Sequence, residues 1–133
     1  MESIFSKIVK GEIPAYNLAE NNRFLAFLDI NPLVLGHALV IPKEQVDYMF
    51  DLEDKNLADL HVFAKGVAKA IQKVTGCRRI GTCVIGFEVP HAHLHLIPIN
   101  SMSDMNFANP KLKPSKEEFE AITAKIKAAY ENN

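Results

Sequence analysis

The chain has 133 residues, a length that predicts one domain covering residues 1–133. Fifteen Lys and Arg residues stand against 16 Asp and Glu residues, and the formal charge of −1 argues against a nucleic-acid polymer as partner. No apolar run approaches the roughly 20 residues of a membrane-spanning helix, and the first residues lack a signal-peptide pattern. Two cysteines, Cys77 and Cys83, match neither a disulfide framework nor the usual zinc spacing. We therefore expect a cytoplasmic protein without membrane contact.

The N-terminal part of the chain is predicted to hold one short helix and three strands. Apolar residues recur on one side of residues 3–10, and Gly11 ends that helix. Residues 15–20 and 23–29 have the pattern of two strands in a hairpin. The apolar run 38–41, which a proline stops, indicates the third strand.

Two further helices are predicted in the rest of the chain. Apolar residues recur at helical spacing over residues 54–75, and Gly76 follows as a left-handed C-terminal residue. Ser115 and Glu118 match a capping box at the start of a closing helix. Residues 101–114, which contain two prolines and two asparagines, are expected to form a long loop.

Two more strands complete the expected architecture. They cover residues 80–85 and 92–99 and are joined across residues 86–90. Strands that follow one another directly favour an antiparallel sheet over a doubly wound parallel one. The predicted fold class is therefore α+β, with a five-stranded antiparallel sheet, one long helix and short terminal helices.

Three histidines alternate with apolar residues in the last predicted strand. Side chains two residues apart in a strand lie on one face of the sheet, so His91, His93 and His95 are expected to line one side of it. The intervening Ala92 and Leu94 have the apolar character of a packed face. On a helix the same spacing would spread the rings about 200° around the axis.

Three interpretations of this cluster are open from the residues alone. The first is a polar strand face without chemistry. The second is a zinc site that His37 or His61 completes, since imidazole is a common zinc ligand. The third, which we favour, is nucleophilic and acid–base chemistry on a phosphate ester or phosphoramidate, because a neutral imidazole attacks phosphorus and its neighbours donate hydrogen bonds.

The segment 91–97, of the form H-x-H-x-H followed by apolar residues, resembles the histidine triad (HIT) nucleotide hydrolases and transferases. Blocks at residues 4–14, 27–32 and 36–43 resemble the same family in the same order. The resemblance implies a HIT-like five-stranded sheet and a homodimer in which the sheet is continuous. It also implies a purine nucleotide as substrate, one site per subunit, and no obligatory metal or cofactor.

The resemblance further implies roles for four histidines. His93 is expected to attack the α-phosphorus and form a nucleotidyl-histidine intermediate, while a backbone carbonyl holds its other ring nitrogen. His95 is expected to hydrogen-bond the phosphate oxygens, and His37 to complete the phosphate environment. His91 is expected to support the site from behind. His61 matches no family role and is expected on a helix face or at a dimer interface.

The nucleotide itself is expected to contact a second set of residues. Asp29 is expected to accept hydrogen bonds from the ribose hydroxyls, since an ionised carboxylate only accepts. Gly86 fits a glycine of the family. An apolar slot for the base is expected from Phe5, Ile8, Phe27 and Ile30, although a plain core role is the alternative for these residues.

The sequence departs from the family pattern at the N-terminus. Ser3 and Ser6 stand where many bacterial members carry a zinc-binding Cys-x-x-Cys, and hydroxyls are poor zinc ligands. We therefore predict no structural zinc site. Gln45 stands where some members have a histidine, and the chain has no tryptophan.

A second departure lies directly before the triad. The loop that normally separates the fourth strand from the triad is short here and lacks its usual Asn or Gln. Glu88 stands where Ser or Thr commonly contacts the leaving group. Its carboxyl group is a candidate general acid, or a partner for a cationic amine leaving group.

Several functions follow from this pattern. The one that we favour is cleavage at the α-phosphate of a nucleoside phosphoramidate or acyl-nucleotide, as in the Hint branch. The alternatives are dinucleoside polyphosphate hydrolysis, as in the Fhit branch, a nucleotide-binding interaction protein without catalysis, and a metal-binding domain. His95 argues against the uridylyltransferase branch, which normally has Gln at that position.

Overall fold

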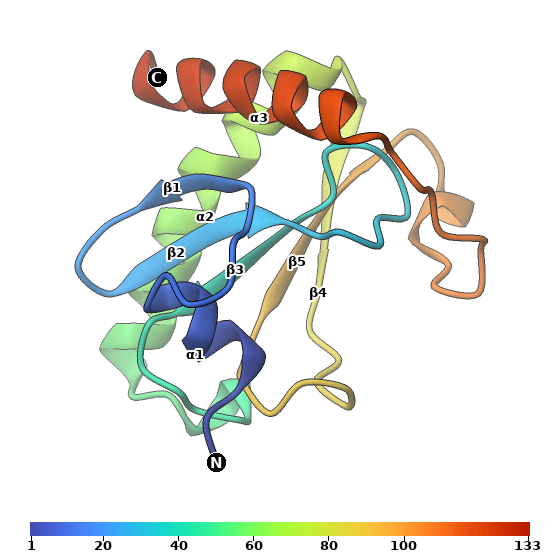
Figure 1. Ribbon diagram of the computed structural model, residues 1–133. Helices are drawn as coiled ribbons and strands as arrows, with labels where there is room; N and C mark the ends of the chain where they lie inside the picture. The colour runs from blue at the N-terminus through green and yellow to red at the C-terminus, as the bar shows by residue number, and fades with distance from the viewer.

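Five strands form one antiparallel sheet in the order β1-β2-β3-β5-β4 (Figure 1). The computed structural model describes all 133 residues. The α+β fold and the five-stranded antiparallel sheet expected from the sequence are confirmed. The strands are β1 (Asn17–Glu20), β2 (Phe24–Leu28), β3 (Ala38–Pro42), β4 (Arg79–Cys83) and β5 (Leu94–Ile99).

Helices cover both faces of this sheet. The short helix α1 and the long helix α2 lie on opposite faces, and α3 packs against α2 and β1 (Figure 1). None of these helices is both long and apolar enough to cross a membrane. The helices are α1 (Ile4–Val9), α2 (Asp54–Thr75) and α3 (Lys116–Glu131), with two 3-10 turns, η1 (Met49–Asp51) and η2 (Met102–Met105).

The ends of α2 and α3 follow from local chemistry. Gly76 adopts a φ of 69° after α2, a left-handed conformation that glycine reaches at little cost, and its N–H donates to the carbonyl of Gln72. At the start of α3, the N–H of Glu118 donates to Ser115 Oγ at 3.1 Å, and the N–H of Ser115 donates to the Glu118 carboxylate at 3.0 Å. Helix α2 therefore spans the predicted residues 54–75, and α3 begins where the capping box predicts.

The central strands are buried on both faces, which explains why every residue of β2 and β3 is apolar. Alternate residues such as Phe24 and Ala26 belong to the larger core beneath α2 and α3. The intervening Leu25 and Phe27 belong to a smaller apolar cluster with Phe5 of α1. This second cluster forms the floor on which the candidate site is built.

The strand expected over residues 92–99 begins only at Leu94, so the prediction was wrong at its start. The N–H of Ala92 donates to the carbonyl of Val46 at 2.7 Å, beyond the end of β3, and therefore not to a sheet neighbour. The adjacent β4 also ends early, at Cys83, whose sheet partner is His95. His91 and His93 consequently precede the strand, and His95 lies within it.

Candidate active site

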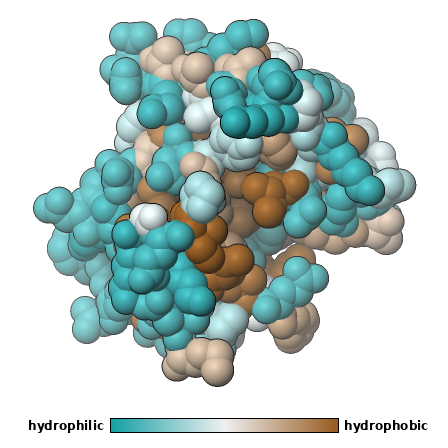
Figure 2. Space-filling view, viewed as in Figure 1, coloured by the Kyte–Doolittle hydropathy of each residue, from teal (hydrophilic) through white to brown (hydrophobic).

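A pocket of about 540 Å³ opens between α1, the loop after β2 and the segment that leads into β5. Figure 2 shows apolar side chains exposed in a hollow on the face of the molecule that Figure 1 presents. Every predicted site residue except His91 lines this pocket, namely Phe5, Ile8, Phe27, Asp29, Ile30, His37, Gly86, Glu88, His93 and His95. The fold thus brings together side chains from across 90 residues of sequence, roughly two-thirds of the chain.

His93 is held by a backbone group and has one unengaged ring nitrogen. Its Nδ1 lies 2.8 Å from the carbonyl oxygen of His91, which is the kind of backbone contact expected from the sequence. A carbonyl only accepts, so Nδ1 carries the proton and Nε2 keeps its lone pair in the neutral ring. The edge of Phe5 packs against the ring, with centroids 5.1 Å apart. A neutral imidazole in this state is a nucleophile.

His37 and His95 form a relay whose proton positions follow from a backbone donor. The N–H of Leu33 donates to His37 Nδ1 at 3.1 Å, so the proton of the neutral His37 ring sits on Nε2. That Nε2–H donates to His95 Nδ1 at 2.9 Å, which leaves the proton of His95 on its own Nε2. The second ring therefore presents a hydrogen-bond donor.

Both rings of the relay are neutral at pH 7. Burial is the main cause, because removal from water disfavours the charged form. It lowers the pKa of His37 to about 3 and the pKa of His95 to about 4. The charges of neighbouring groups add to the effect, His95 and Lys111 for His37, and His93 for His95.

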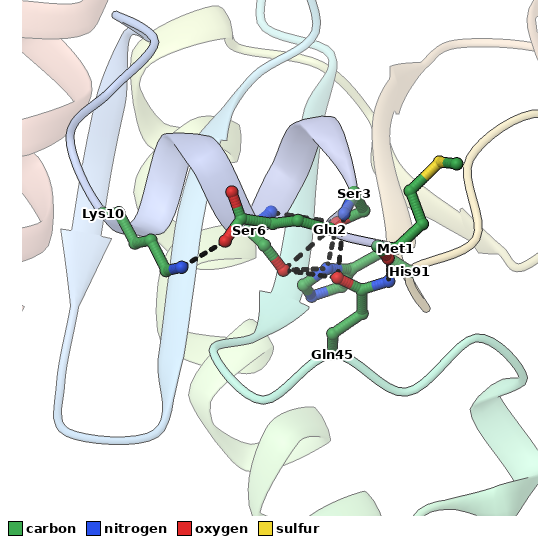
Figure 3. Close-up of polar contacts among 7 residues, drawn as sticks. All are labelled: Met1, Glu2, Ser3, Ser6, Lys10, Gln45 and His91. Carbon is green, nitrogen blue, oxygen red and sulfur yellow. Dashed lines mark hydrogen bonds and ion pairs between the residues drawn. The ribbon is translucent and has the colours of Figure 1, made fainter.

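His91 lies behind the pocket and does not line it. Its side chain is fully buried, and burial lowers its pKa. The Nε2–H donates to the carbonyl of Pro42 at 2.7 Å, so Nδ1 accepts, and it accepts from the hydroxyl of Ser3 at 2.7 Å (Figure 3). The expectation that three imidazoles line one side was wrong for this ring, because α1 covers it.

Asp29 stands at the end of β2, beside the relay. Its Oδ1 accepts from the N–H of Asn31 at 2.8 Å, and its Oδ2 lies 3.7 Å from His37 Nε2. Burial raises the pKa of this carboxyl group. Because His37 is neutral, the 3.7 Å approach is not an ion pair, and the carboxylate oxygens are available as acceptors.

Asp29, His37 and His95 also bring potential metal ligands within 4.8 Å of one another. The hydrogen bonds around His37 oppose this use of the site. Its Nδ1 already accepts from the N–H of Leu33, so ligation through Nε2 would require the ring to lose its only proton. The donor set therefore fits hydrogen bonding better than metal coordination.

The apolar side of the pocket combines rigid and exposed residues. Phe5 and Phe27 are buried and meet edge to face, with centroids 5.4 Å apart. Ile8 is half-buried beside them, whereas the side chain of Ile30 is 64% exposed at the rim. Together they form a slot with aromatic and aliphatic walls, which suits a planar ring.

The opposite rim carries both signs of charge. Gly86 takes a φ of 85°, which turns the chain into the short segment before the triad, and the exposed Glu88 follows it. Lys111, which sequence reasoning missed, lines the pocket from the loop before α3. Its charge acts on the relay, since it contributes to the low pKa of His37.

Phe107 is a second residue of this loop that lines the pocket and that sequence reasoning missed. Its ring packs edge-on against His95, with centroids 5.1 Å apart. The N–H of Leu112 donates to the carbonyl of Pro32 at 2.9 Å and so ties this loop to the chain after β2. A loop residue shows no periodicity, and a single phenylalanine in the loop expected over 101–114 was the only signal in the sequence.

His61 lies apart from the pocket. It is exposed on α2, and its Nδ1 lies 3.0 Å from the carbonyl of Leu57 in the same helix. This is the helix-face position expected for it.

Comparison with known proteins identifies relatives over nearly the whole chain. The HIT domain model matches residues 10–102. Adenosine 5′-monophosphoramidase hnt1 of Schizosaccharomyces pombe is 42% identical over 129 residues, which cover 95% of this chain and 96% of that protein. Adenosine 5′-monophosphoramidase HNT1 of Saccharomyces cerevisiae is 43% identical over 96 residues, which cover 71% of this chain and 61% of that protein.

Solved structures agree with the sequence comparison. A Hit-like protein of Bartonella henselae superposes with a TM-score of 0.81 at 29% identity, covering 96% of each chain. A zinc-bound histidine triad family protein of Mycobacterium smegmatis superposes with a TM-score of 0.83 at 27% identity, covering 99% of this chain and 95% of that one. Two histidines of the triad line the pocket, and the HIT domain model matches most of the chain, so the chain belongs to the HIT family.

Proposed function

We propose that this protein hydrolyses nucleoside phosphoramidates and acyl-nucleotides at the α-phosphorus and releases a nucleoside monophosphate. The observation that carries the proposal is the bond of His93 Nδ1 to the His91 carbonyl, which leaves Nε2 free to attack at the pocket. The similarity to two adenosine 5′-monophosphoramidases supports the choice of the phosphorus–nitrogen bond.

The reaction takes two displacements at phosphorus. The lone pair of His93 Nε2 forms a bond to the α-phosphorus, the phosphorus–nitrogen bond breaks, and the amine leaves with that electron pair and takes a proton from solvent. Water then attacks the same phosphorus and releases a proton to solvent, the bond to His93 breaks, and its electron pair returns to Nε2 and restores the ring. This nucleotidyl-histidine route divides one hydrolysis into two easier steps.

The neighbouring groups suit the charge that develops. The Nε2–H of His95, whose place the relay from His37 determines, is the donor for a non-bridging phosphate oxygen. Asp29 is positioned to accept from the ribose hydroxyls. The slot around Phe5 and Phe27 takes the base, for which we propose a purine because the walls of the slot are aromatic and apolar.

A comparison of two substrates tests this function. The protein is incubated with an AMP–amine phosphoramidate and with a diadenosine polyphosphate, and AMP release is followed beside His93→Ala and His61→Ala. We expect faster release from the phosphoramidate, loss of at least about a thousandfold in His93→Ala, and unchanged activity in His61→Ala. Equal activity of His93→Ala and the unmodified protein would overturn the assignment of His93 as the nucleophile.

The other outcomes decide between the alternatives. Faster cleavage of the polyphosphate favours a Fhit-like hydrolase. Nucleotide binding without AMP release from either substrate favours an interaction protein. Stoichiometric zinc held by Asp29, His37 and His95 in the purified protein favours a metal-binding domain.

We also propose that two copies associate through β4, which gives a continuous sheet across the dimer. β4 is an edge strand, and its outer backbone groups have no partner within the sheet. Val84 and Ile85, which follow this strand, are 40% and 47% exposed, and such apolar residues favour burial against a second copy. Light scattering on the eluting protein tests this: a dimer mass is expected, and Thr82→Pro in β4 is expected to shift it to the monomer.

A further inference from the structure

We propose that Ser3 is a positioning residue for the nucleophile. Its hydroxyl holds the ring of His91 by donating to Nδ1, and the carbonyl of His91 in turn holds His93. Ser3 is also the N-cap of α1, which carries Phe5 of the base slot. It therefore fixes the position of the base slot relative to the reacting ring. The inference rests on the proposed nucleotidyl transfer at His93.

The hydroxyl of Ser3 accepts one hydrogen bond and donates another from a buried position, and it also lies 3.2 Å from the Ser6 hydroxyl. As the cap of α1, its Oγ accepts from the N–H of Ser6 at 2.9 Å. The same hydroxyl donates to His91 Nδ1 at 2.7 Å (Figure 3). Nδ1 of His91 is the acceptor in this bond, because the carbonyl of Pro42 only accepts and therefore holds the proton of the neutral ring on Nε2.

Gln45 determines that Ser3, rather than Ser6, serves His91. Its Oε1 accepts from the Ser6 hydroxyl at 2.8 Å and from the N–H of Ser3 at 2.8 Å. The proton of Ser6 is thereby engaged, and its Oγ stands at 3.4 Å from His91 Nδ1, against 2.7 Å for Ser3. Gln45 Nε2 donates to the carbonyl of Met1 at 2.9 Å, which completes a closed network (Figure 3).

The network reaches the reacting ring by two routes. The first route runs from the Ser3 hydroxyl to the ring of His91, and from the carbonyl of His91 to Nδ1 of His93, which lies 2.8 Å away. The second is by packing, since Phe5 stands two residues after Ser3 and its ring lies edge-on to His91 and His93 at 5.8 and 5.1 Å. A shift of α1 therefore moves the base slot and the nucleophile relative to each other.

Removal of the hydroxyl leaves a buried ring nitrogen without a donor. In Ser3→Ala, Nδ1 of the fully buried His91 loses its nearer donor, and the Ser6 hydroxyl at 3.4 Å already donates to Gln45. The bond of Nε2–H to the Pro42 carbonyl then holds the ring from one side, and the ring is freer to turn. A turn of the His91 ring displaces the carbonyl that holds His93. Small displacements of a reacting group lower the rate more than the affinity.

The kinetic test compares two capping serines. Ser115 caps α3 in the same manner, with its Oγ 3.1 Å from the N–H of Glu118, and it does not line the pocket. In Ser3→Ala we expect kcat for the AMP–amine phosphoramidate to fall about tenfold, with KM within about twofold. Ser115→Ala is expected to keep the kcat and KM of the unmodified protein, and Ser3→Thr, which retains a hydroxyl, to recover most of the kcat.

A spectroscopic test does not require activity. Nitrogen-15 NMR of the imidazole rings is expected to show His91 protonated at Nε2 and His93 at Nδ1 in the unmodified protein, in agreement with their bonds. In Ser3→Ala we expect the Nδ1 signal of His91 to shift, because this nitrogen loses the Ser3 hydroxyl as donor. Gln45→Ala, at an exposed residue, provides a second variant, with a fall in kcat of about threefold.

The possible results separate the two proposals. Wild-type kcat in folded Ser3→Ala, an equal fall in Ser115→Ala, or an unchanged His91 spectrum in Ser3→Ala overturns the role of Ser3. If Ser3→Ala does not fold, unchanged kcat in Gln45→Ala overturns it. An unmodified protein that releases no AMP contradicts the proposed function instead, and the ring spectra still decide whether Ser3 determines the state of His91.

Discussion

Nε2 of His37 donates a hydrogen bond to Nδ1 of His95 over 2.9 Å, between residues 58 positions apart in the chain. The direction of this bond follows from the N–H of Leu33, which donates to the other nitrogen of His37. A backbone amide thereby determines which nitrogen of His95 carries its proton. The site presents a lone pair on His93 beside a donor on His95, and attack at a phosphate needs this complementary pair.

Removal of His37 is expected to weaken catalysis by releasing His95. In His37→Ala, His95 Nδ1 has no donor, so its proton is no longer held on Nε2, and we expect kcat/KM for the phosphoramidate to fall about tenfold or more. His37→Gln, whose amide N–H can donate, is expected to retain more activity. Steady-state kinetics with both variants checks this, and activity of His37→Ala within twofold of the unmodified protein contradicts the relay.

The stability of the fold is expected to fall as the pH drops below about 6.5. The folded-state pKa values of His37, about 3, and His95, about 4, lie below the ordinary value of 6.5, so the unfolded chain binds more protons in this window. Stability therefore increases with pH up to the ordinary value and is lost below it. Each ring contributes about 1 kcal/mol per pH unit well inside the window.

Urea unfolding at pH 7, 6 and 5 measures this dependence. In this range the exposed carboxylates stay largely ionised, and their contribution to the slope is small. His37→Gln is expected to reduce the slope, and His61→Gln, at an exposed position of α2, to leave it unchanged. A free energy of unfolding that is constant from pH 7 to pH 5 is incompatible with two buried neutral rings.

Substitutions at two residues of the base slot are expected to affect different properties, substrate affinity in one case and stability of the fold in the other. The side chain of Ile30 is 64% exposed, so Ile30→Ser is expected to raise KM severalfold and to change the free energy of unfolding by less than about 0.5 kcal/mol. Phe27 is 3% exposed, and Phe27→Ala is expected to cost about 3–5 kcal/mol. Substrate titration and denaturant unfolding of both variants check this, and a loss of stability in Ile30→Ser would place that residue in the core.

The charges at the rim are expected to set the preference among leaving groups. Glu88 and Lys111 both line the pocket. The negative charge of Glu88 repels an anionic polyphosphate, and the positive charge of Lys111 attracts it. Glu88→Gln is expected to raise the ratio of kcat/KM for diadenosine polyphosphate to that for the phosphoramidate about threefold, and Lys111→Gln to lower it similarly. The ratio, measured at low and high salt, isolates the charge effect, and a ratio that neither variant changes contradicts it.

Several elements could be predicted from the sequence because their causes are local. Helix α2 covers the predicted residues 54–75, since its apolar spacing and the glycine after it both lie within the helix. The capping box at the start of α3 joins Ser115 to Glu118, which is only three residues further along the chain. The alternating histidines likewise indicated a chemical face for His93 and His95, which do share the pocket.

The start of β5 could not be predicted in this way. Alternation continues back to His91, but the backbone of Ala92 bonds to Val46, and this partner lies 46 residues earlier. Backbone pairing of a strand ends at the residue where the neighbouring strand changes direction. The residue pattern of the strand itself does not indicate where this happens.

By itself, the sequence determined the type and order of the elements, the family pattern and the nucleophile that the pattern implies. Only the tertiary structure decided the state of each ring: Ser3 reaches His91 across 88 residues, and His37 reaches His95 across 58. It also brought Lys111 and Phe107 from a loop without periodicity to the pocket. The physical reason is that periodicity and capping depend on neighbours in the chain, whereas the proton position of a buried imidazole depends on whichever donor or carbonyl the fold places beside it.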